Sequence, residues 1–240
     1  MKKAVIILSI ITLSCMQSYK AFGQTVRNDT VFLLEKYYPN GDGKPWYHAV
    51  FIDTNKKSRF YDQISDFNMN EYHQSHYNWS VENLREKKIA LTKRKITGLP
   101  LRWIILYQYK GNFYTYKPSE FSPHLMVNIT DTAFIDKVVE GPVANKIIDF
   151  TQTDDKTFQF KLTGAYAQNR TLIIHIIDNK NGIAVFEDSY YRFGEEEKRF
   201  YLMISADKIK NLPIIVNYCA EMRTNEFDFD EPDFDKLLNK

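Results

Sequence analysis

The residues whose types and spacing could bind a ligand are tyrosines on both sides of a tight turn. The Gly-Asn pair at 111–112 suits a two-residue hairpin loop, because glycine at the first position favours a type II′ turn. That register pairs Tyr109 with Tyr114, and it places four tyrosine rings on one face: Tyr107, Tyr109, Tyr114 and Tyr116. Aromatic rings stack on sugars, and tyrosine hydroxyls add hydrogen bonds. The four tyrosines are therefore candidate glycan-binding residues; the alternative, which the frequent burial of aromatic residues favours, is that this face belongs to the core.

A second set of residues that could do chemistry is the histidine pair His73 and His76. On a helix, side chains three residues apart share a face, so the two imidazoles could bind a metal with Glu71 or a distant acid. Zinc sites need three or four ligands, and the sequence indicates no third one. The favoured interpretation is a polar surface loop, and we expect no cofactor.

Enzyme motifs with a local spacing are absent from the sequence. It contains no Gly-x-Ser-x-Gly elbow, no His-Glu-x-x-His helix, no P-loop and no dinucleotide-binding glycine pattern. A glycosidase is compatible with this absence, because its two carboxylates are distant in sequence and form no local motif. A secreted hydrolase with a carboxylate pair is therefore the enzyme alternative to a binding protein.

The elements that must position these residues are mostly strands. Phe158, Phe160 and Leu162 alternate with polar residues, which is the pattern of a half-buried strand. Segments 172–177 and 183–186 flank a turn-rich loop and predict a β-hairpin. Further strands are predicted at 31–38, 49–52, 103–109, 200–205 and 214–219. This spacing predicts a mainly β protein, an antiparallel sandwich or barrel.

One short helix is predicted at 81–91. Ser80 is a good N-cap and Glu82 lies in the first turn, where the helix dipole favours an acid. After the N-terminal leader, residues 24–240 are predicted to form a single β-rich domain. The alternative is two lobes that meet at 140–142, because Gly and Pro there interrupt regular structure.

The C-terminal tail is predicted to pack through its aromatic residues. Phe227, Phe229 and Phe234 are interleaved with a dense run of acids between 221 and 240. The spacing of these acids is not that of an EF-hand loop. We expect the rings to dock on the body of the protein and the carboxylates to remain in water.

The N-terminus has the three parts of a secretory signal. Lys2 and Lys3 precede an apolar run at 4–16, and small residues precede the expected cleavage after Gly23, so 1–23 is predicted to be a signal peptide. A lipid anchor at Cys15 is the alternative.

The charge and hydropathy of residues 24–240 limit the classes of partner that the protein is expected to bind. The leader contains Lys2, Lys3 and Lys20 and no acid, so its removal changes the formal net charge from +2 to −1. This value argues against a nucleic-acid partner. No other apolar run is long enough to span a membrane.

Two stretches resemble known proteins. Residues 109–119 with 130–135, and residues 212–219 with the tail, resemble exported proteins of unknown function from Bacteroidetes-type bacteria. The resemblance implies a location in the periplasm, on the cell surface or outside the cell, and no activity. We thus predict an extracytoplasmic binding protein whose partner is a glycan or an envelope protein. Besides the hydrolase, a structural or assembly role in the envelope is an alternative.

Overall fold

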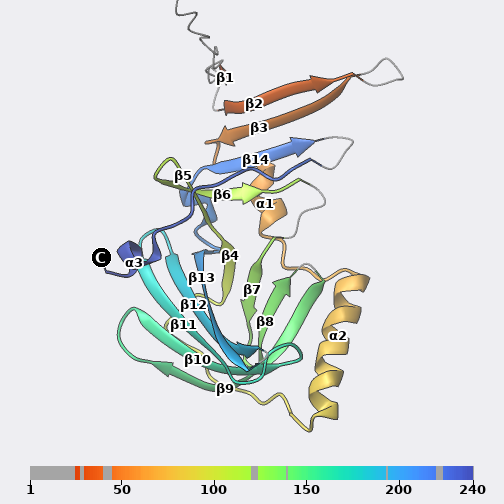
Figure 1. The fold of residues 1–240 in the computed structure, drawn as a ribbon, viewed down its shortest axis with the longest axis vertical. Coiled ribbons are helices and arrows are strands. Elements are labelled where there is room, and N and C mark those ends of the chain that lie inside the picture. Colours follow the sequence, from red (N-terminus) through yellow and green to blue (C-terminus); the bar gives the residue numbers. More distant parts are fainter. Residues whose placement is uncertain are drawn as a thin grey trace, which may run out of the picture.

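Two β-sheets contain most of the regular structure, a closed barrel and a second, open sheet (Figure 1). The computed structural model describes residues 25–27, 30–39, 45–119, 124–138, 140–192, 194–219 and 224–239. The prediction of a mainly β, antiparallel, barrel-like fold is confirmed. The predicted signal peptide, residues 1–23, and Cys15 lie outside the described residues.

The barrel is an up-and-down arrangement of antiparallel strands. Its eight strands are β4 (Arg102–Ile105), β7 (Met126–Ile129), β8 (Ala133–Val138), β9 (Gly141–Gln152), β10 (Thr157–Gly164), β11 (Arg170–Asp178), β12 (Ile183–Arg192) and β13 (Glu195–Ser205). From β7 to β13 each strand pairs with the next one in sequence, and β4 closes the barrel between β13 and β7. The predicted hairpin is the β11–β12 pair.

Period-2 alternation decides what fills the barrel. Side chains two apart on a strand point to the same face, so Phe158, Phe160 and Leu162 all enter the lumen. They pack there against large residues of other strands, including Trp103 and Phe134, and are fully buried. One part of the barrel interior is therefore an apolar core.

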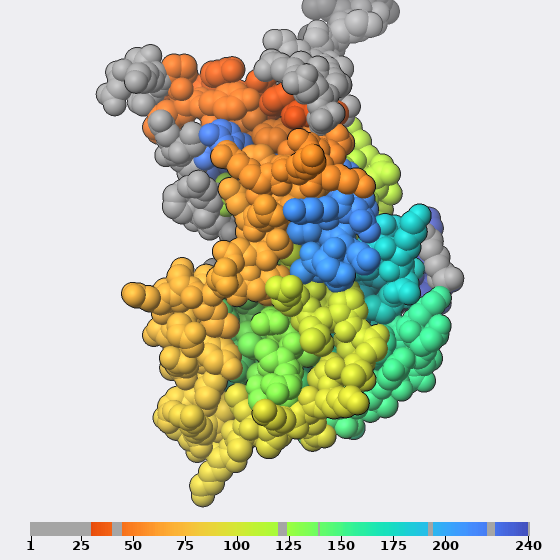
Figure 2. Space-filling view, turned by 180° about the vertical axis from the view of Figure 1, so that it is seen from behind, coloured from red at the N-terminus to blue at the C-terminus, as the bar shows by residue number. Residues whose placement is uncertain are grey.

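The open sheet lies above the barrel and combines strands from distant parts of the chain. Its order is β1 (Thr25–Arg27), β2 (Thr30–Tyr38), β3 (Trp46–Asp53), β14 (Ile214–Cys219), β6 (Asn112–Lys117) and β5 (Tyr107–Tyr109). In Figure 2 the N-terminal segments (orange) and the segment that leads into β14 (blue) lie side by side above the barrel. The alternative boundary at 140–142 falls in the turn between two paired barrel strands, where Val138 lies opposite Gly141.

A shared apolar layer joins the open sheet to the barrel. Val216 of β14 packs with Leu202 and Ile104, which point outward from the barrel, and with Tyr61. Three short helical segments border this layer: α1 (Arg59–Ile64), η1 (Ile209–Asn211) and α3 (Phe234–Leu238).

The main helix, α2 (Glu71–Glu86), differs from the predicted helix at 81–91. Its N-cap is Asn70, whose side chain accepts a hydrogen bond from the His73 amide. Ser80 lies inside the helix, where its hydroxyl donates to the Tyr77 carbonyl and accepts from the Ala144 amide of β9. The prediction was wrong because this hydroxyl bonds a neighbouring strand and caps no helix end.

Helix α2 ends early and covers one outer face of the barrel. Lys88 has a φ of 58°, a left-handed conformation that cannot continue an α-helix. Tyr77 and Val81 pack on Ala133 and Ile135 of β8, and Figure 1 shows the helix alongside the barrel. No helix in the described part of the chain is long and apolar enough to cross a membrane.

The predicted docking of the C-terminal tail is confirmed. The Phe229 ring stacks on Tyr107 with ring centroids 4.3 Å apart, and Phe227 meets Tyr109 edge-on at 5.0 Å. Phe234 stacks on Phe200 of β13 at 5.3 Å. The acids between these rings are exposed. The tail therefore belongs to the folded body.

We expect Phe229→Ala to lower the free energy of unfolding by about 2 kcal/mol, less than the 3–5 kcal/mol of a fully buried phenylalanine, because Phe229 is half-buried. Urea denaturation would measure it. Asp228→Ala is the matched control, since its exposed side chain should change stability by no more than about 0.5 kcal/mol. Equal effects of the two substitutions would show that the tail contributes no packing energy.

Candidate functional site

The tyrosine hairpin exists, but its register differs from the predicted one. Tyr107 lies opposite Tyr114, and Tyr109 lies opposite Asn112. The loop is Lys110-Gly111, and both residues have positive φ values, 49° and 76°, as a type I′ turn requires. The predicted loop, Gly111-Asn112, was one residue too far along the chain, because Lys110 adopts a positive φ and Asn112 already pairs with Tyr109. The shift preserves the side-chain parity, so the four rings still share one face.

That face is covered by the C-terminal tail. Tyr116 is buried, and Tyr107, Tyr109 and Tyr114 are half-buried in a cluster with Phe227 and Phe229. Burial, together with the nearby Glu226 carboxylate, raises the pKa of Tyr107 to about 12. The Tyr116 hydroxyl donates to that carboxylate, and Asn217 of β14 donates to the Tyr116 oxygen at 3.2 Å. In this arrangement the tyrosine rings pack against one another and against the tail, and only Tyr116 is fully buried.

The histidine pair lies on α2 and not in a loop. The His76 Nδ1 is 3.2 Å from the Pro142 carbonyl oxygen, and its ring packs on Trp79. Burial, Lys137 and His76 together lower the pKa of His73. Within the described ranges no group of three His, Cys, Asp or Glu side chains could hold a metal ion.

The site that the structure reveals is a cavity of about 540 Å³ at one end of the barrel lumen. Its mouth is formed by the connection from β8 to β9, with Glu140, and by the connection from β10 to β11, with Tyr166 and Ala167. Leu172 and Phe186 line it on the side of the apolar core. A volume of this size is typical of pockets for small ligands.

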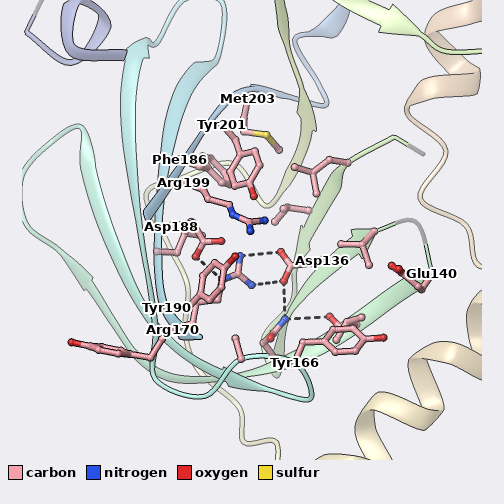
Figure 3. A pocket seen from close by; sticks show the side chains of 18 residues that line it. Asp136, Glu140, Tyr166, Arg170, Phe186, Asp188, Tyr190, Arg199, Tyr201 and Met203 are labelled. Atoms are coloured by element: carbon pink, nitrogen blue, oxygen red, sulfur yellow. Dashed lines mark hydrogen bonds and ion pairs between the residues drawn. The ribbon is translucent and has the colours of Figure 1, made fainter. Parts of the chain in front are cut away.

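An ionic triad spans this cavity (Figure 3). Arg170 of β11 donates from Nε to Oδ1 of Asp188 on β12 at 2.7 Å. Its two terminal nitrogens donate to the carboxylate of Asp136 on β8, the Nη2–Oδ1 distance being 3.3 Å. All three side chains are at least 86% buried, with exposed fractions of 12%, 7% and 14%. The guanidinium therefore links carboxylates from two different walls of the lumen.

A buried amide extends the triad. Asn145 of β9 donates from Nδ2 to Asp136 Oδ2 at 2.9 Å and to the Phe134 carbonyl at 3.1 Å. Gly164 of β10 lies against it, and a Cβ atom there would be only 2.1 Å from the Asn145 Oδ1. Glycine at 164 thus makes room for the amide that orients Asp136.

The electrostatics of the triad leave an excess negative charge. Burial raises the pKa of the Asp188 carboxyl above its usual range, although Arg170 acts in the opposite direction. Burial alone would lower the pKa of the Arg170 guanidinium, but Asp136 and Asp188 outweigh it and raise that pKa. Two carboxylates therefore share one guanidinium inside the lumen, where unpaired charge is costly.

Aromatic and charged side chains surround the triad. Arg199 lies over the Tyr190 ring, 5.5 Å from its centroid, and donates to Glu197 at 2.8 Å, so its charge is paired within the protein. Figure 3 shows Tyr190 beside Arg170 and Tyr201 further along the same wall. The cavity thus offers flat aromatic surfaces beside hydrogen-bonding groups of both kinds.

Our reading of the sequence missed the triad, although a signal for it is present. Arg170 is in phase with Leu172 and Ile174, and Asp188 is in phase with Ala184 and Phe186, all of which face the lumen. A charged residue in phase with the buried positions of its strand should not be there unless it has a partner. That rule would have selected both residues without a motif.

Comparison of the chain with protein-family models, curated proteins and solved structures gave no match. A fold alone does not imply a function. The function must therefore be inferred from the geometry of the lumen.

The triad predicts losses of stability of different size for two substitutions. Arg170→Gln leaves two carboxylates close together in the lumen and should lower the free energy of unfolding by about 3–5 kcal/mol. Asp188→Asn leaves one guanidinium and one carboxylate in balance and should cost less than about 1.5 kcal/mol. Chemical denaturation at neutral pH would measure both. A larger loss of stability for Asp188→Asn than for Arg170→Gln would contradict the conclusion that the triad carries an excess negative charge.

A half-buried histidine outside the cavity, His124, is a separate titratable group. Both ring nitrogens of His124 are buried without a hydrogen-bond partner among the described residues. Burial, with smaller contributions from Lys137 and Lys117, lowers its pKa to about 4. The folded protein therefore resists protonation of this ring.

The His124 shift predicts a loss of stability in mild acid. Because the unfolded chain takes up a proton near pH 6.5 and the folded chain only near pH 4, stability should fall as the pH drops through this window, by on the order of 3 kcal/mol. The measurement is the free energy of unfolding of wild type and His124→Leu between pH 7 and pH 4. Their difference should change across the window, and parallel curves would refute the assignment.

Proposed function

We propose that this chain is an extracytoplasmic binding protein that holds a saccharide in the lumen of its barrel. The observation that carries the proposal is the triad of Asp136, Arg170 and Asp188 in the cavity. Eight-stranded up-and-down barrels have interiors that can be filled by side chains or can hold one small ligand. Here one part is filled, and the other is hollow and lined by apolar side chains around the buried charged groups.

The triad is hard to explain by stability alone. Burying ions costs solvation energy, and replacing buried ion pairs by apolar residues is often neutral or stabilising. The rest of the lumen shows that this barrel packs well with apolar side chains. Departures from such packing rules are expected at functional sites. The triad therefore supports a role in binding.

The arrangement of polar groups favours a neutral ligand rich in hydroxyl groups. A hydroxyl both donates and accepts hydrogen bonds, so neighbouring hydroxyls can pair with a carboxylate and with a guanidinium at the same time. A simple anion would meet the excess negative charge, and a simple cation would meet Arg170. The tyrosine rings beside the triad suit the apolar face of a sugar ring.

The hydrolase alternative finds less support in the same cavity. Asp136 and Asp188 are a carboxylate pair, but both are bound to the guanidinium of Arg170, which lies between them. A glycosidase needs its two carboxylates on either side of the scissile bond. Here that position is filled by Arg170, so the geometry favours binding over cleavage.

The sequence supports the proposed location. The N-terminal pattern at 1–23 is that of an export signal, and the resemblance of residues 109–119 to exported proteins is consistent with it. A glycan in the cell envelope is therefore a ligand that the protein could meet.

Calorimetry with glucose, galactose, mannose and N-acetylglucosamine tests the proposal. We expect at least one to bind, and Asp188→Asn to weaken that binding about tenfold, because a charge-assisted hydrogen bond becomes neutral. Asp154→Asn, a fully exposed acid in the β9–β10 turn, is the matched control and should bind as wild type does. The proposal fails if none of the four sugars binds, or if the two variants behave alike.

A further inference from the structure

Exposed aromatic side chains gather beside the mouth of the cavity. We name Tyr72, His76 and Trp79 of α2, together with Tyr166, the aromatic ledge. The His76 and Trp79 ring centroids are 5.3 Å apart, and those of Trp79 and Tyr166 are 5.7 Å apart. Tyr72, Trp79 and Tyr166 have exposed fractions of 62%, 46% and 63%. Large apolar side chains clustered on a surface mark an interaction site.

The aromatic ledge continues directly into the cavity. Tyr166 is a member of both, since its side chain lines the cavity and its ring contacts Trp79. Tyr72 donates from its hydroxyl to the carbonyl of Glu140, a residue at the cavity mouth, at 3.1 Å. A ligand that leaves the lumen past Tyr166 therefore meets the ledge at once.

The ledge is held in place before any ligand arrives. Its helix is fixed to the barrel by the bond from the Ala144 amide to the Ser80 hydroxyl, 2.9 Å long. His76 lies against Gly141, where a Cβ atom would come within 3.1 Å of its ring. Side chains fixed in this way lose little entropy on binding. Neighbouring rings are tilted by 38° and 43° to each other, so the row suits a ligand of repeating units that can turn from one ring to the next.

We infer that the ligand is an oligosaccharide, with its terminal sugar in the lumen and the following sugars stacked on the aromatic ledge. This inference rests on the proposed function and extends it from a single sugar to a chain. Each pyranose has an apolar face that can stack on an aromatic ring, and hydroxyls that can bond neighbouring polar groups. On the ledge these groups are the Tyr166 hydroxyl and the His76 imidazole, whose Nε2 lies 3.5 Å from the Tyr166 oxygen.

The test compares sugars of different length on variants of the lumen and of the ledge. The probes are glucose, maltotetraose and cellotetraose, and N-acetylglucosamine with its β-1,4-linked tetrasaccharide, measured by calorimetry on the full protein. We expect a tetrasaccharide to bind about tenfold more tightly than its monosaccharide. Trp79→Ala should remove that gain and leave monosaccharide binding unchanged, because Trp79 does not line the cavity. Tyr37→Ala is the matched control, because this tyrosine of β2 is 64% exposed and lies on the open sheet.

The outcomes separate the two proposals. If a monosaccharide binds but no tetrasaccharide binds more tightly, or if Trp79→Ala leaves the gain intact, the ledge inference is wrong and the lumen proposal stands. If tetrasaccharides bind through Trp79 and Asp188→Asn has no effect, the lumen proposal fails and the ledge remains. If no probe binds, both are wrong. Sedimentation velocity would measure the oligomeric state of wild type and of Trp79→Ala. If wild type is a dimer and Trp79→Ala is a monomer, the ledge is a contact between copies of the chain and the inference is overturned.

Discussion

Closure of the barrel by β4 is the constraint on which the other features depend. This strand has four residues, pairs with β13 on one side and β7 on the other, and so removes the open edges that the meander would otherwise present. Immediately after it, Leu106 donates to the Leu202 carbonyl at 2.8 Å, and the chain then enters β5 of the open sheet. One short segment thus closes the lumen and joins the two sheets.

Closure also divides the interior into two environments. Away from the cavity, large residues such as Phe160 exclude water and give the barrel its core. At the cavity end the strands present Asp136, Arg170 and Asp188 to one another across the lumen. Low polarity next to the triad strengthens its hydrogen bonds and makes its excess charge costly. The same geometry therefore creates the cavity and sets the kind of ligand that would satisfy it.

Much of the fold could be predicted from the sequence, because strands with one buried face have a period of two. Phe158, Phe160 and Leu162 show this plainly, and the β11–β12 hairpin has a turn-rich loop. Local signals failed where a distant contact decided the outcome, as at Ser80, whose hydroxyl bonds Ala144. The site could not be assembled from sequence, because Asp136 and Arg170 become neighbours only when the barrel closes. The row of exposed rings on α2 could not be predicted either, because the helix begins at Glu71 and the sequence predicted a start at residue 81.

The strand order of the open sheet has a consequence for biosynthesis. Its central strand β14 lies near the C-terminus and pairs with β3 near the N-terminus, so that Ile214 lies opposite Asp53. Contacts between such distant residues form slowly, whereas the hairpins of the barrel are local. Before β14 is made, β2 can pair with β3 and β5 with β6, but these two parts of the sheet are not yet joined. The open sheet is therefore completed late, after synthesis of almost the whole chain, whereas the barrel hairpins can form during synthesis.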